Sequence, residues 1–408
     1  MPLYIKKCRN CNSKSIINLF NLGKIRFTGK FPKYKEKIPH GELNLVMCKS
    51  CKLVQLKHIF NMSYLYNKDY GYRTGINLTM SNHVKNVVRK ISKVAKLKSG
   101  DSVLDIASND GTILRNYNSR IQTWGIDPIL LKFKKEYRKI NYKISNFFDY
   151  KLVLKKNKKI KFKIISALSV FYDLETPNTF LNGIKKLLHK NGIFYLEFQD
   201  LMMIIKHNMF DTICHEHLEY YSVTFINKLL KKHNLRIFDH SYNDINGGSS
   251  AYLICHDDAK YKTNKNKINK ILLNEKKFGI EKVSTYKKFK KRIDLMKKKL
   301  NLKIKKIMKS KKTIHGYAAS TKGNVLLQYY NLDNKKIKFI SDRNPRKTNL
   351  YTPGSNIRII SEAESRKHNP DYYLVLAWHF KKEILLREKM IRKMGTKFIF
   401  PLPNIEII

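Results

Sequence analysis

Four cysteines near the N-terminus fall into two pairs, and two residues separate the thiols of each pair. The pairs are Cys8 with Cys11 and Cys48 with Cys51. Four thiolates with this spacing can close a tetrahedral site around one zinc ion. A redox or iron site is the alternative use of such thiols. The intervening segment is longer than in common zinc fingers, so we expect it to contain small strands of its own.

A second group of reactive side chains is the run Cys214, His215, Glu216 and His217. These groups could be metal ligands, but four consecutive residues cannot easily converge on one ion without a strained backbone. Imidazoles and carboxylates are also the usual groups of general acid–base catalysis. Cys255 has no obvious partner, and this cysteine usage suits metal binding in a reducing compartment better than a disulfide framework.

A third group of polar residues follows a β-rich run at 102–106. The segment LDIASNDGTIL has Ala107 where dinucleotide-binding loops have a glycine, and a cofactor without a phosphate at this loop needs less of a glycine cradle. Its acidic and amide groups suit the cationic and amino ends of S-adenosylmethionine. We therefore expect that cofactor, bound by Asp105, Ala107, Ser108, Asn109, Gly111, Asp127 and Ala167.

The elements that must position these side chains alternate along residues 100–256. β-rich runs and helical patterns take turns there, which is typical of a doubly wound α/β sheet. We expect a helix from about Thr112, and we expect segment 167–172 to cover one side of the adenosine. Ligands of such sheets bind beyond the carboxyl ends of the strands, where Asp127 can accept both ribose hydroxyls. The expected strands are 102–106, a second ending at Asp127, 163–168, 192–198, 235–239 and 251–255.

Lysine and arginine number 83 against 31 acidic residues, which gives a formal net charge of +52. Such a charge could indicate a nucleic-acid or anionic-membrane partner. Lysine is spread along almost the whole chain, however, whereas a nucleic-acid binder gathers basic residues on one face beside aromatic groups. The densest basic run, 281–312, has the pattern of an amphipathic helix whose outer face is rich in lysine. Its expected inner residues are Val283, Phe289, Ile293, Met296, Leu300, Ile304 and Met308.

The charge pattern and the apolar content limit which binding partners and which cellular location we expect. We expect no nucleic-acid partner. No run reaches the roughly 18 to 20 apolar residues that span a bilayer, and the N-terminus leads straight into the cysteines, so we expect a cytoplasmic protein without a membrane partner. The 408 residues, 42 % of them apolar, suffice for two or three domains with normal cores. The sequence leaves the oligomeric state open.

Several separated segments resemble a known family. They are LDIASNDGTIL, NKDYGYRTGINLTMSNH (67–83), FDTICHEHLEYYS (210–222), GYAASTKGN (316–324), SDRNPRKTNLYTPG (341–354), DYYLVLAWHF (371–380) and FIFPLP (398–403). Over essentially its whole length the chain resembles the sugar C-methyltransferase family. The resemblance implies a small zinc-binding domain, which we place at 1–66, and a central Rossmann-like class I methyltransferase sheet at 67–262. A linker helix and a second Rossmann-like α/β domain would occupy 263–408.

The resemblance also implies a reaction, the transfer of a methyl group from S-adenosylmethionine to a carbon of a nucleotide-linked keto-deoxysugar. A carbon beside a ketone is a very weak acid, so a base must remove its proton while the enolate oxygen is stabilised. By motif matching, His217 is the general base, and Glu216 and His215 orient the sugar or help to stabilise the enolate. Tyr72 and Arg73 would close the sugar pocket.

The chain departs from the family pattern at Cys214, where many relatives have a tyrosine with a supporting role near the sugar. This difference puts a step assisted by that phenol in question. Tyr220 or Tyr221 could supply a phenol instead, or the enolate is held in a different way.

In the third domain, Lys322 and Gly323 occupy a strand-to-helix turn. Backbone amides and an ammonium there could meet the diphosphate of a nucleotide-diphosphate keto-sugar substrate. Asp342 follows the next strand, together with Arg343 and Asn344, and is placed to contact a nucleoside. A capped turn is an equal interpretation of that second segment.

Two other functions stay open on the sequence alone. An RNA or protein methyltransferase would account for the charge and the cysteines, but it leaves the His-Glu-His run and the third domain unexplained. A non-catalytic zinc-bearing binding module predicts a blocked cofactor cleft. The intact Asp105, Gly111 and Asp127 argue against that second alternative.

Overall fold

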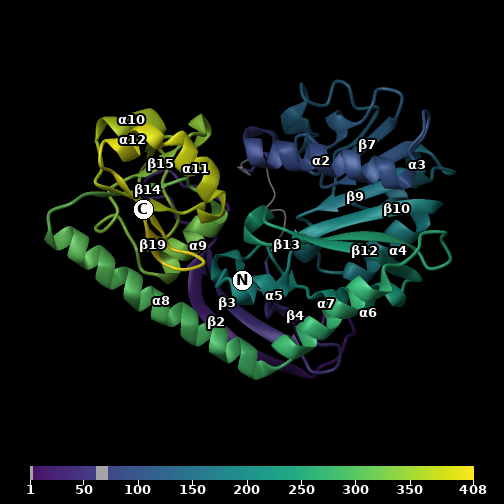
Figure 1. Ribbon diagram of the computed structural model, residues 1–408, viewed down its shortest axis with the longest axis horizontal. Coiled ribbons are helices and arrows are strands. Elements are labelled where there is room, and N and C mark those ends of the chain that lie inside the picture. The colour runs from purple at the N-terminus through teal and green to yellow at the C-terminus, as the bar shows by residue number, and fades with distance from the viewer. Residues whose placement is uncertain (1–2, 61–71) are drawn as a thin grey trace.

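The computed structural model describes residues 3–60 and 72–408. It contains three main sheets, and Figure 1 shows the central sheet in blue and teal, the C-terminal sheet in green and yellow, and the purple N-terminal sheet beneath both. The first residues of the segment 67–83 that resembles the family, 67–71, lie outside the described residues. In the described part of the chain, no helix is long and apolar enough to cross a membrane.

The N-terminal sheet is antiparallel and has the strand order β11-β4-β3-β2. Its long strands β2 and β3 lie between the two cysteine pairs, which confirms the expectation of strands there. The fourth strand, β11, comes from a distant part of the chain directly after His217 and pairs with β4. The strands are β2 Ile16–Arg26, β3 His40–Cys48, β4 Val54–Leu56 and β11 Glu219–Tyr220; a separate pair joins β1 Leu3–Tyr4 to β5 His58–Ile59.

The central sheet has seven strands in the order β12-β13-β10-β9-β6-β7-β8, with β6, the first in sequence, inside the sheet between β9 and β7. The strands β6 to β10 run parallel, and β13 is antiparallel to both of its neighbours. All six expected strands are present, with small differences at their ends. They are β6 Ser102–Ile106, β7 Gln122–Ile126, β9 Phe162–Leu168, β10 Leu188–Gln199, β12 Leu235–Asn243 and β13 Ser249–His256; the additional strand is β8 Tyr142–Ile144.

Helices cover both faces of the central sheet. The helix α2 packs on one face, where Val87 and Ile91 share a core with Val103 of β6. Helices α4 and α6 pack on the other face, in a core that also contains Leu53 of the N-terminal region. The helices of this part are α2 Leu78–Ala95, α3 Tyr150–Lys156, α4 Pro177–Leu187, α5 Leu201–Lys206, α6 Val223–Lys231 and α7 Lys265–Phe278.

The helix that we expected from Thr112 is not formed. After β6 the chain makes only a 3₁₀ turn at Leu114–Asn116. The side-chain Nδ2 of Asn116 donates to the carbonyl oxygen of Thr112 at 2.7 Å, so a side chain occupies an acceptor that a longer helix would use for a backbone bond. The loop after β6 therefore leads into a tight turn and not into the N-terminus of a helix.

The C-terminal part contains a second Rossmann-like sheet with the order β16-β15-β14-β17-β18-β19, parallel except for β19. Its first strand, β14, lies between β15 and β17, so the order of the strands reverses direction at the end of β14. The strands are β14 Ile314–Tyr317, β15 Ile340–Asp342, β16 Ile359–Ser361, β17 Tyr372–Val375, β18 Lys397–Phe400 and β19 Glu406–Ile407. The helices are α9 Thr321–Tyr329, α10 Glu362–Lys367, α11 Lys381–Arg387 and α12 Lys389–Lys393.

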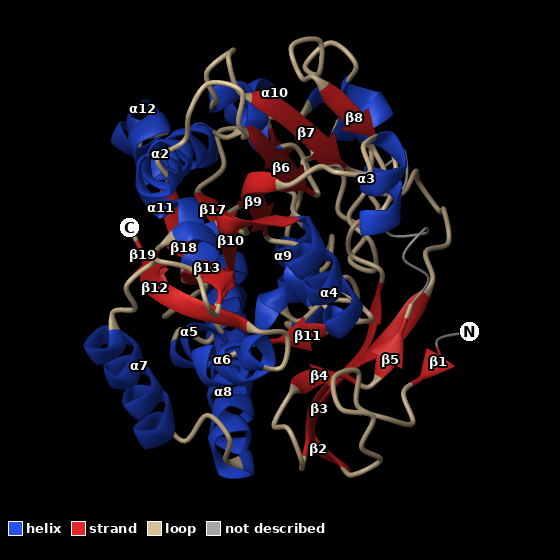
Figure 2. Ribbon diagram, turned by 90° about the vertical axis from the view of Figure 1, so that its right-hand side faces the viewer, coloured by secondary structure: helices blue, strands red, loops and turns tan. Residues whose placement is uncertain are grey.

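The long basic helix is α8, Val283–Lys309, and it docks on the rest of the protein (Figure 1). It packs against β2, and Figure 2 shows both in the lower part of the molecule. One continuous core joins the N-terminal sheet, α5, α8 and the C-terminal sheet. The expected inner residue Met308 is 40 % exposed, whereas Tyr286 and Ile307 are buried, because the apolar positions follow the 3.6-residue period along the buried face. The other expected inner residues are buried or partly buried: Val283, Phe289, Ile293, Met296, Leu300 and Ile304.

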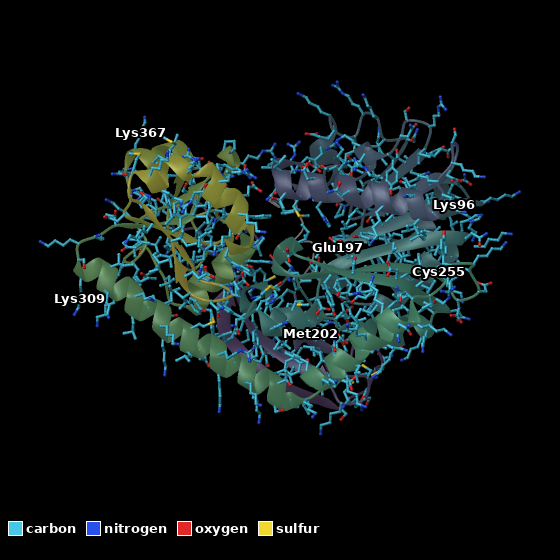
Figure 3. All side chains as sticks on the ribbon, in the orientation of Figure 1. Lys96, Glu197, Met202, Cys255, Lys309 and Lys367 are labelled. Carbon is cyan, nitrogen blue, oxygen red and sulfur yellow. The ribbon has the colours of Figure 1, made fainter. Side chains whose placement is uncertain are left out.

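Lysine side chains lie on widely separated parts of the surface. Figure 3 shows Lys96, Lys309 and Lys367 at three different edges of the molecule. This arrangement agrees with the spread of lysine along the sequence.

Candidate active site and zinc centre

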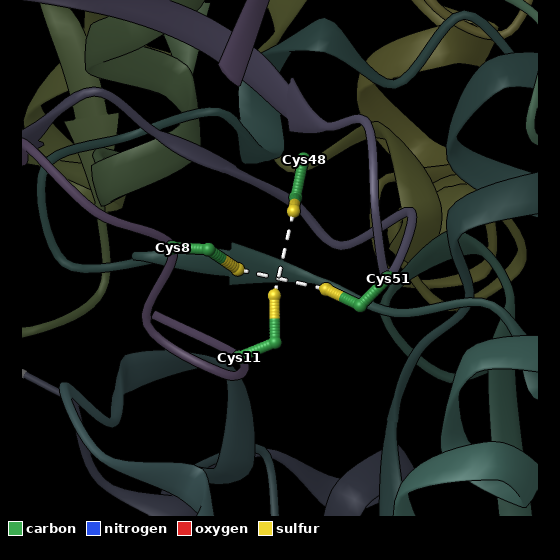
Figure 4. Close-up of side chains that lie close together, drawn as sticks. All are labelled: Cys8, Cys11, Cys48 and Cys51. Atoms are coloured by element: carbon green, nitrogen blue, oxygen red, sulfur yellow. Dashed lines mark hydrogen bonds between the residues drawn. The ribbon is translucent and has the colours of Figure 1, made fainter. Parts of the chain in front are cut away.

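The four cysteines of the N-terminal pairs converge on one point (Figure 4). Their sulfur atoms all lie within 4.8 Å of one another, and the Sγ atoms of Cys8 and Cys51 are 3.5 Å apart. A tetrahedral zinc ion with Zn–S bonds of about 2.3 Å requires sulfur atoms about 3.8 Å apart. The donor set and its geometry therefore fit zinc. Apolar residues cover the site as expected, since Leu53 and Val54 are buried beside it.

The zinc centre is connected to the segment that carries His217. Gln55 of β4 donates from Nε2 to the sulfur of Cys8 at 3.4 Å, and the guanidinium of Arg9 donates to the carbonyl oxygen of Leu56 at 2.7 Å. The strand that holds Gln55 pairs with β11, which follows His217 by two residues. The metal site thus fixes β4, and β4 pairs with the strand that directly follows the His-Glu-His segment.

A cavity of about 600 Å³ lies where the N-terminal, central and C-terminal parts meet. Its volume is in the range of sites for small molecules, about 300 to 1,000 Å³. The N-terminal part contributes Gly29 and Phe31, the central part contributes the loop after β6, and the C-terminal part contributes the loop after β14. Asn324 of α9 donates to the carbonyl oxygen of Thr28 at 2.8 Å, which ties two of the three parts together beside the cavity.

The loop after β6 forms one wall of this cavity. Ala107 and Asn109 have positive φ angles of 57° and 49°, and Gly111 follows with 71°. The carboxylate of Asp127 holds this shape, because its Oδ2 accepts the backbone N–H of Asn109 at 2.8 Å. At Gly111 an added Cβ would lie 3.2 Å from the ring of Tyr137, so both the backbone angle and the space favour glycine.

Asp105 lies at the bottom of the same wall, 2 % exposed. Its only hydrogen-bond donor among the described residues is the hydroxyl of Ser166, 2.6 Å from Oδ1. Burial raises the pKa of Asp105 to about 7, because a carboxylate loses its hydration there. A buried carboxylate that borders a cavity without a cationic partner fits a positively charged ligand such as S-adenosylmethionine.

Five of the seven residues expected at the cofactor border the cavity, and Gly111 and Ala167 do not. Gly111 supports the turn from behind. Ala167 is fully buried in the core of the central sheet, because β9 is paired on both sides and its alternate side chains point to opposite faces. Leu168 and Ser169, which follow it, border the cavity in its place. The five are Asp105, Ala107, Ser108, Asn109 and Asp127.

Tyr72 and Arg73 border the cavity beside the cofactor loop. The guanidinium of Arg73 pairs with Asp110 at 3.0 Å and with Glu136 at 2.6 Å. The backbone N–H of Gly75 donates to Oδ2 of Asp110 at 3.0 Å. This segment therefore clamps the loop after β6, and closure of a sugar pocket by Tyr72 and Arg73 stays a prediction.

His217 borders the cavity with one ring nitrogen fixed. Its Nδ1 lies 2.7 Å from the carbonyl oxygen of Thr212, so Nδ1 carries the hydrogen and donates it. Burial, and then the positive charge of Lys322, lower the pKa of His217 to about 3. The ring is therefore neutral at ordinary pH, and its Nε2 is an acceptor. Tyr172 lies against it, with the ring centroids 4.2 Å apart.

Glu216 is buried at the wall of the cavity. Its Oε2 accepts a weak hydrogen bond from Thr28 at 3.4 Å, and its Oε1 has no partner among the described residues. Burial raises the pKa of Glu216 above its usual range. An added Cβ on Gly29 would lie 2.5 Å from Oε1, so glycine leaves room for this carboxyl group.

His215 does not reach the cavity, which corrects the expectation that it takes part in the chemistry. A turn closed by the bond from the His217 N–H to the Cys214 carbonyl turns the His215 ring toward the N-terminal sheet. There it lies between the rings of Phe27 and Phe60, with centroid distances of 4.6 Å and 4.7 Å. His215 is a packing residue.

A tyrosine ring that contacts His217 belongs to neither of the tyrosines that we considered. Tyr221 donates to Glu219, away from the cavity. Tyr220 is buried, and its hydroxyl has no partner in the described part of the chain. Tyr172 borders the cavity and contacts His217, although the sequence placed it beside the adenosine.

Lys322 borders the cavity, and its Nζ donates to the carbonyl oxygen of Asn246 at 3.1 Å. Gly323 does not border it, because its N–H donates to Oγ of Ser320, the cap of α9. Asp342 borders the cavity. Both of its carboxylate oxygens accept backbone N–H groups, at 2.7 Å from Ala319 and 2.8 Å from Asn344, so a capped turn is present, and contact with a nucleoside stays a prediction.

Gln199 and Asn246 are cavity residues that sequence reasoning missed. Gln199 ends β10, and the rule that ligands bind at the carboxyl ends of strands could have found it. Asn246 acts through its carbonyl oxygen, and a backbone atom leaves no signature in the residue type.

The topology of the central sheet, the loop after its first strand and the cavity define a methyltransferase that uses S-adenosylmethionine. Family models support this class along the chain: a zinc-binding domain matches residues 8–66, a methyltransferase domain matches 70–240, and a C-methyltransferase C-terminal domain matches 244–403. The three matches follow one another along the chain from residue 8 to residue 403. It is 28 % identical to C-methyltransferase NovU of Streptomyces niveus over 424 residues, which cover 99 % of this chain and 97 % of that one.

Two solved methyltransferase structures are each similar to less than half of the chain. An S-adenosylmethionine-dependent methyltransferase from Clostridium acetobutylicum ATCC 824 covers 43 % of this chain and 92 % of its own, with 14 % identity and a TM-score of 0.36. Magnesium protoporphyrin IX methyltransferase from Synechocystis PCC 6803 covers 46 % of this chain and 90 % of its own, with 14 % identity and a TM-score of 0.34.

Proposed function

We propose that this enzyme methylates a carbon atom beside the ketone of a nucleotide-linked deoxysugar. The observation that carries the proposal is the neutral His217, whose free Nε2 shares one cavity with the cofactor loop and with the C-terminal domain. S-adenosylmethionine, when bound, supplies an electrophilic methyl group. The domains are proposed at 1–66, 67–262 and 263–408.

His217 is the proposed general base. Its Nε2 takes the proton from the carbon beside the ketone, and the electrons of the broken C–H bond form the enolate. The carbon then forms a bond to the methyl group while the methyl–sulfur bond of the donor breaks and its electron pair stays on sulfur, which leaves S-adenosylhomocysteine. The ketone returns, and His217 releases its proton to solvent. The Thr212 carbonyl supports this step, because it also stabilises the imidazolium through Nδ1–H.

Glu216 is proposed to position the sugar. Its raised pKa favours a protonated carboxyl group, which can donate a hydrogen bond as well as accept one. Oε1 has no hydrogen-bond partner among the described residues. We propose that a sugar hydroxyl bonds this carboxyl group when the substrate binds.

The nucleotide diphosphate is proposed to bind at the C-terminal domain. The loop after β14 lies where the strand order reverses, which is the usual ligand position in open α/β sheets. Lys347 lies there with Nζ 2.7 Å from the carbonyl oxygen of Ala319, and Arg343 reaches the carbonyl oxygen of Ile76 at 3.0 Å. A cavity of about 600 Å³ suits a small substrate better than a polynucleotide.

The test combines the purified protein with S-adenosylmethionine and a set of nucleoside-diphosphate-4-keto-6-deoxyhexoses. The expected products are S-adenosylhomocysteine and a sugar nucleotide with one new methyl group on carbon, identified by mass spectrometry and NMR. Calorimetry with a short RNA at two salt concentrations runs in parallel. Turnover that depends on RNA, or no methyl transfer to any of the keto-sugars, would overturn the proposal.

A further inference from the structure

Lys322 brings an incompletely paired positive charge from the C-terminal domain into the active-site cavity. It is the second residue of α9, and its Nζ donates to the carbonyl oxygen of Asn246 in the central part at 3.1 Å. An ammonium has three N–H donors. Within residues 3–60 and 72–408, Nζ has no other hydrogen-bond acceptor and no carboxylate oxygen within 4.0 Å. Two donors are thus free for a ligand.

A chain of hydrogen bonds connects Lys322 to His217. Gln199 Nε2 donates at 2.8 Å to the same Asn246 carbonyl oxygen that Lys322 contacts. The hydroxyl of Thr212 donates to Gln199, and the carbonyl of Thr212 accepts from His217. The ammonium and the imidazole therefore lie in one network at one part of the cavity wall.

The electrostatics agree with this placement. The charge of Lys322 contributes to the low pKa of His217 and to that of His379, which also borders the cavity. Burial lowers the pKa of Lys322 itself, and the attraction of Asp211 opposes that effect. Oδ2 of Asp211 accepts a hydrogen bond from Nε1 of Trp378 at 2.8 Å, and in the described part of the chain Asp211 forms no ion pair with Lys322 within 4.0 Å.

We propose that Lys322 is a catalytic residue that holds the enolate oxygen while His217 takes the proton. This inference rests on the proposed function. The enolate shares its negative charge between the oxygen and the α-carbon. The oxygen then lies beside the ammonium of Lys322, and the α-carbon lies beside the imidazolium of His217. No proton needs to leave Lys322, since hydrogen bonding from its N–H groups suffices. The ammonium of Lys322 stabilises the enolate oxygen, a function to which Cys214 is not suited.

Cys214 explains why another group is needed. Its thiol is fully buried, and burial together with Glu216 raises its pKa well above the ordinary value. A thiol is a weak hydrogen-bond donor. A role of Lys322 at the diphosphate, which the sequence suggested, is less compatible with its contact to Asn246 near His217. Lys347 and Arg343 are the cations at the loop where we place the diphosphate.

The experiment measures exchange of the proton beside the ketone. The probe is dTDP-4-keto-6-deoxyglucose in D₂O, with S-adenosylhomocysteine in place of the methyl donor, and NMR follows deuterium incorporation. The variants are Lys322→Met, which removes the charge at similar length, and Lys322→Arg, which keeps a cation. Lys336→Met is the matched control, because Lys336 bonds Asn301 and Asn331 within the C-terminal part, away from the cavity. Calorimetry with dTDP reports binding of the nucleotide separately.

We expect Lys322→Met to slow exchange about 100-fold or more, with the affinity for dTDP and S-adenosylhomocysteine retained. Lys322→Arg should keep part of the exchange, and Lys336→Met should equal the unsubstituted protein. Normal exchange at saturating sugar with weakened dTDP binding would overturn the inference and assign Lys322 to the diphosphate, while leaving the proposed function intact. No exchange and no methyl transfer in the unsubstituted protein would overturn the proposed function and this inference with it.

Discussion

The Nδ1 atom of His217 lies 2.7 Å from the carbonyl oxygen of Thr212. A carbonyl oxygen only accepts hydrogen bonds, so this contact assigns the hydrogen to Nδ1 and leaves the lone pair on Nε2. The imidazole is thus fixed in both orientation and tautomer by a backbone atom five residues earlier. A base prepared in this way needs no side-chain partner to orient it.

Replacement of His217 by alanine should stop the chemistry and spare the cofactor site. We expect turnover to fall about 10²- to 10⁴-fold, the usual contribution of a general base. Calorimetry should show unchanged affinity for S-adenosylmethionine, because the loop after β6 makes no hydrogen bond to His217 in the described structure. His256→Ala is the control, since His256 also contacts a backbone carbonyl but lies at the far end of β13. Unchanged turnover in His217→Ala would remove this residue from the mechanism.

The buried histidines should make the protein less stable in mild acid. Burial lowers the pKa of His215 to about 3 from an ordinary value of 6.5. Below pH 6.5 His215 therefore binds a proton in the unfolded chain but stays neutral in the folded protein. The free energy of unfolding falls as the pH drops from about 6.5 toward 3. One such group contributes at most about 1.4 kcal/mol per pH unit. Urea unfolding at pH 7, 6 and 5 should show a smaller pH dependence for His215→Leu than for the unsubstituted protein. Equal slopes would contradict the buried neutral state of His215.

Local signals in the sequence were enough for the strands and for the metal site. The cysteine pairs each lie across one turn, so the spacing alone brings two sulfurs together. The strand at 102–106 has every residue buried and matches β6 over its full length. Such elements depend on near neighbours, and a single sequence contains that information.

The errors arose where a distant part of the chain decides the outcome. The ring of His215 turns away from the cavity because the N-terminal sheet offers the rings of Phe27 and Phe60. Gly29 matters because it lies against Glu216, from which it is separated by most of the N-terminal and central parts. The missing helix after Thr112 had a local cause, the side chain of Asn116, which competes for a backbone acceptor.

Loss of the zinc site should reduce turnover more than cofactor affinity. The metal ligands fix β4 through Gln55 and Arg9, and β4 pairs with β11 behind the His-Glu-His segment. Cys11→Ser should lower bound zinc, measured by atomic emission, together with the midpoint of thermal unfolding and the turnover number. Cys255→Ser is the control, because Cys255 lies in β13 away from the zinc site. Full activity in a zinc-free protein would contradict this coupling.

Gly29→Ala should displace Glu216 without straining the loop between β2 and β3, because the backbone of Gly29 does not have a positive φ angle. The added Cβ would lie 2.5 Å from Oε1 of Glu216, closer than such atoms approach in real structures. Because Glu216 is proposed to position the sugar, we expect a raised KM for the keto-sugar, with S-adenosylmethionine affinity retained. Glu216→Gln, which keeps the shape and one donor group, should lose less than Glu216→Ala in the same assay. An unchanged KM in Gly29→Ala would show that the carboxyl group is not needed where it lies.

Binding of the cofactor should strengthen as the pH rises through about 7. The carboxyl group of Asp105 has a pKa of about 7 without a ligand, because it is buried and no cation among residues 3–60 and 72–408 pairs with it. A positively charged ligand favours the ionised form, so at pH 6 binding must release a proton and is weaker than at pH 8. Calorimetry in buffers of different ionisation enthalpy measures that proton directly. Asp105→Asn should bind S-adenosylmethionine more weakly at pH 8 and with little pH dependence. S-adenosylhomocysteine, which lacks the sulfonium charge, should show a smaller pH effect than S-adenosylmethionine with the unsubstituted protein. If the two ligands respond equally to pH, Asp105 does not face the sulfonium, and its partner is a group that both ligands share.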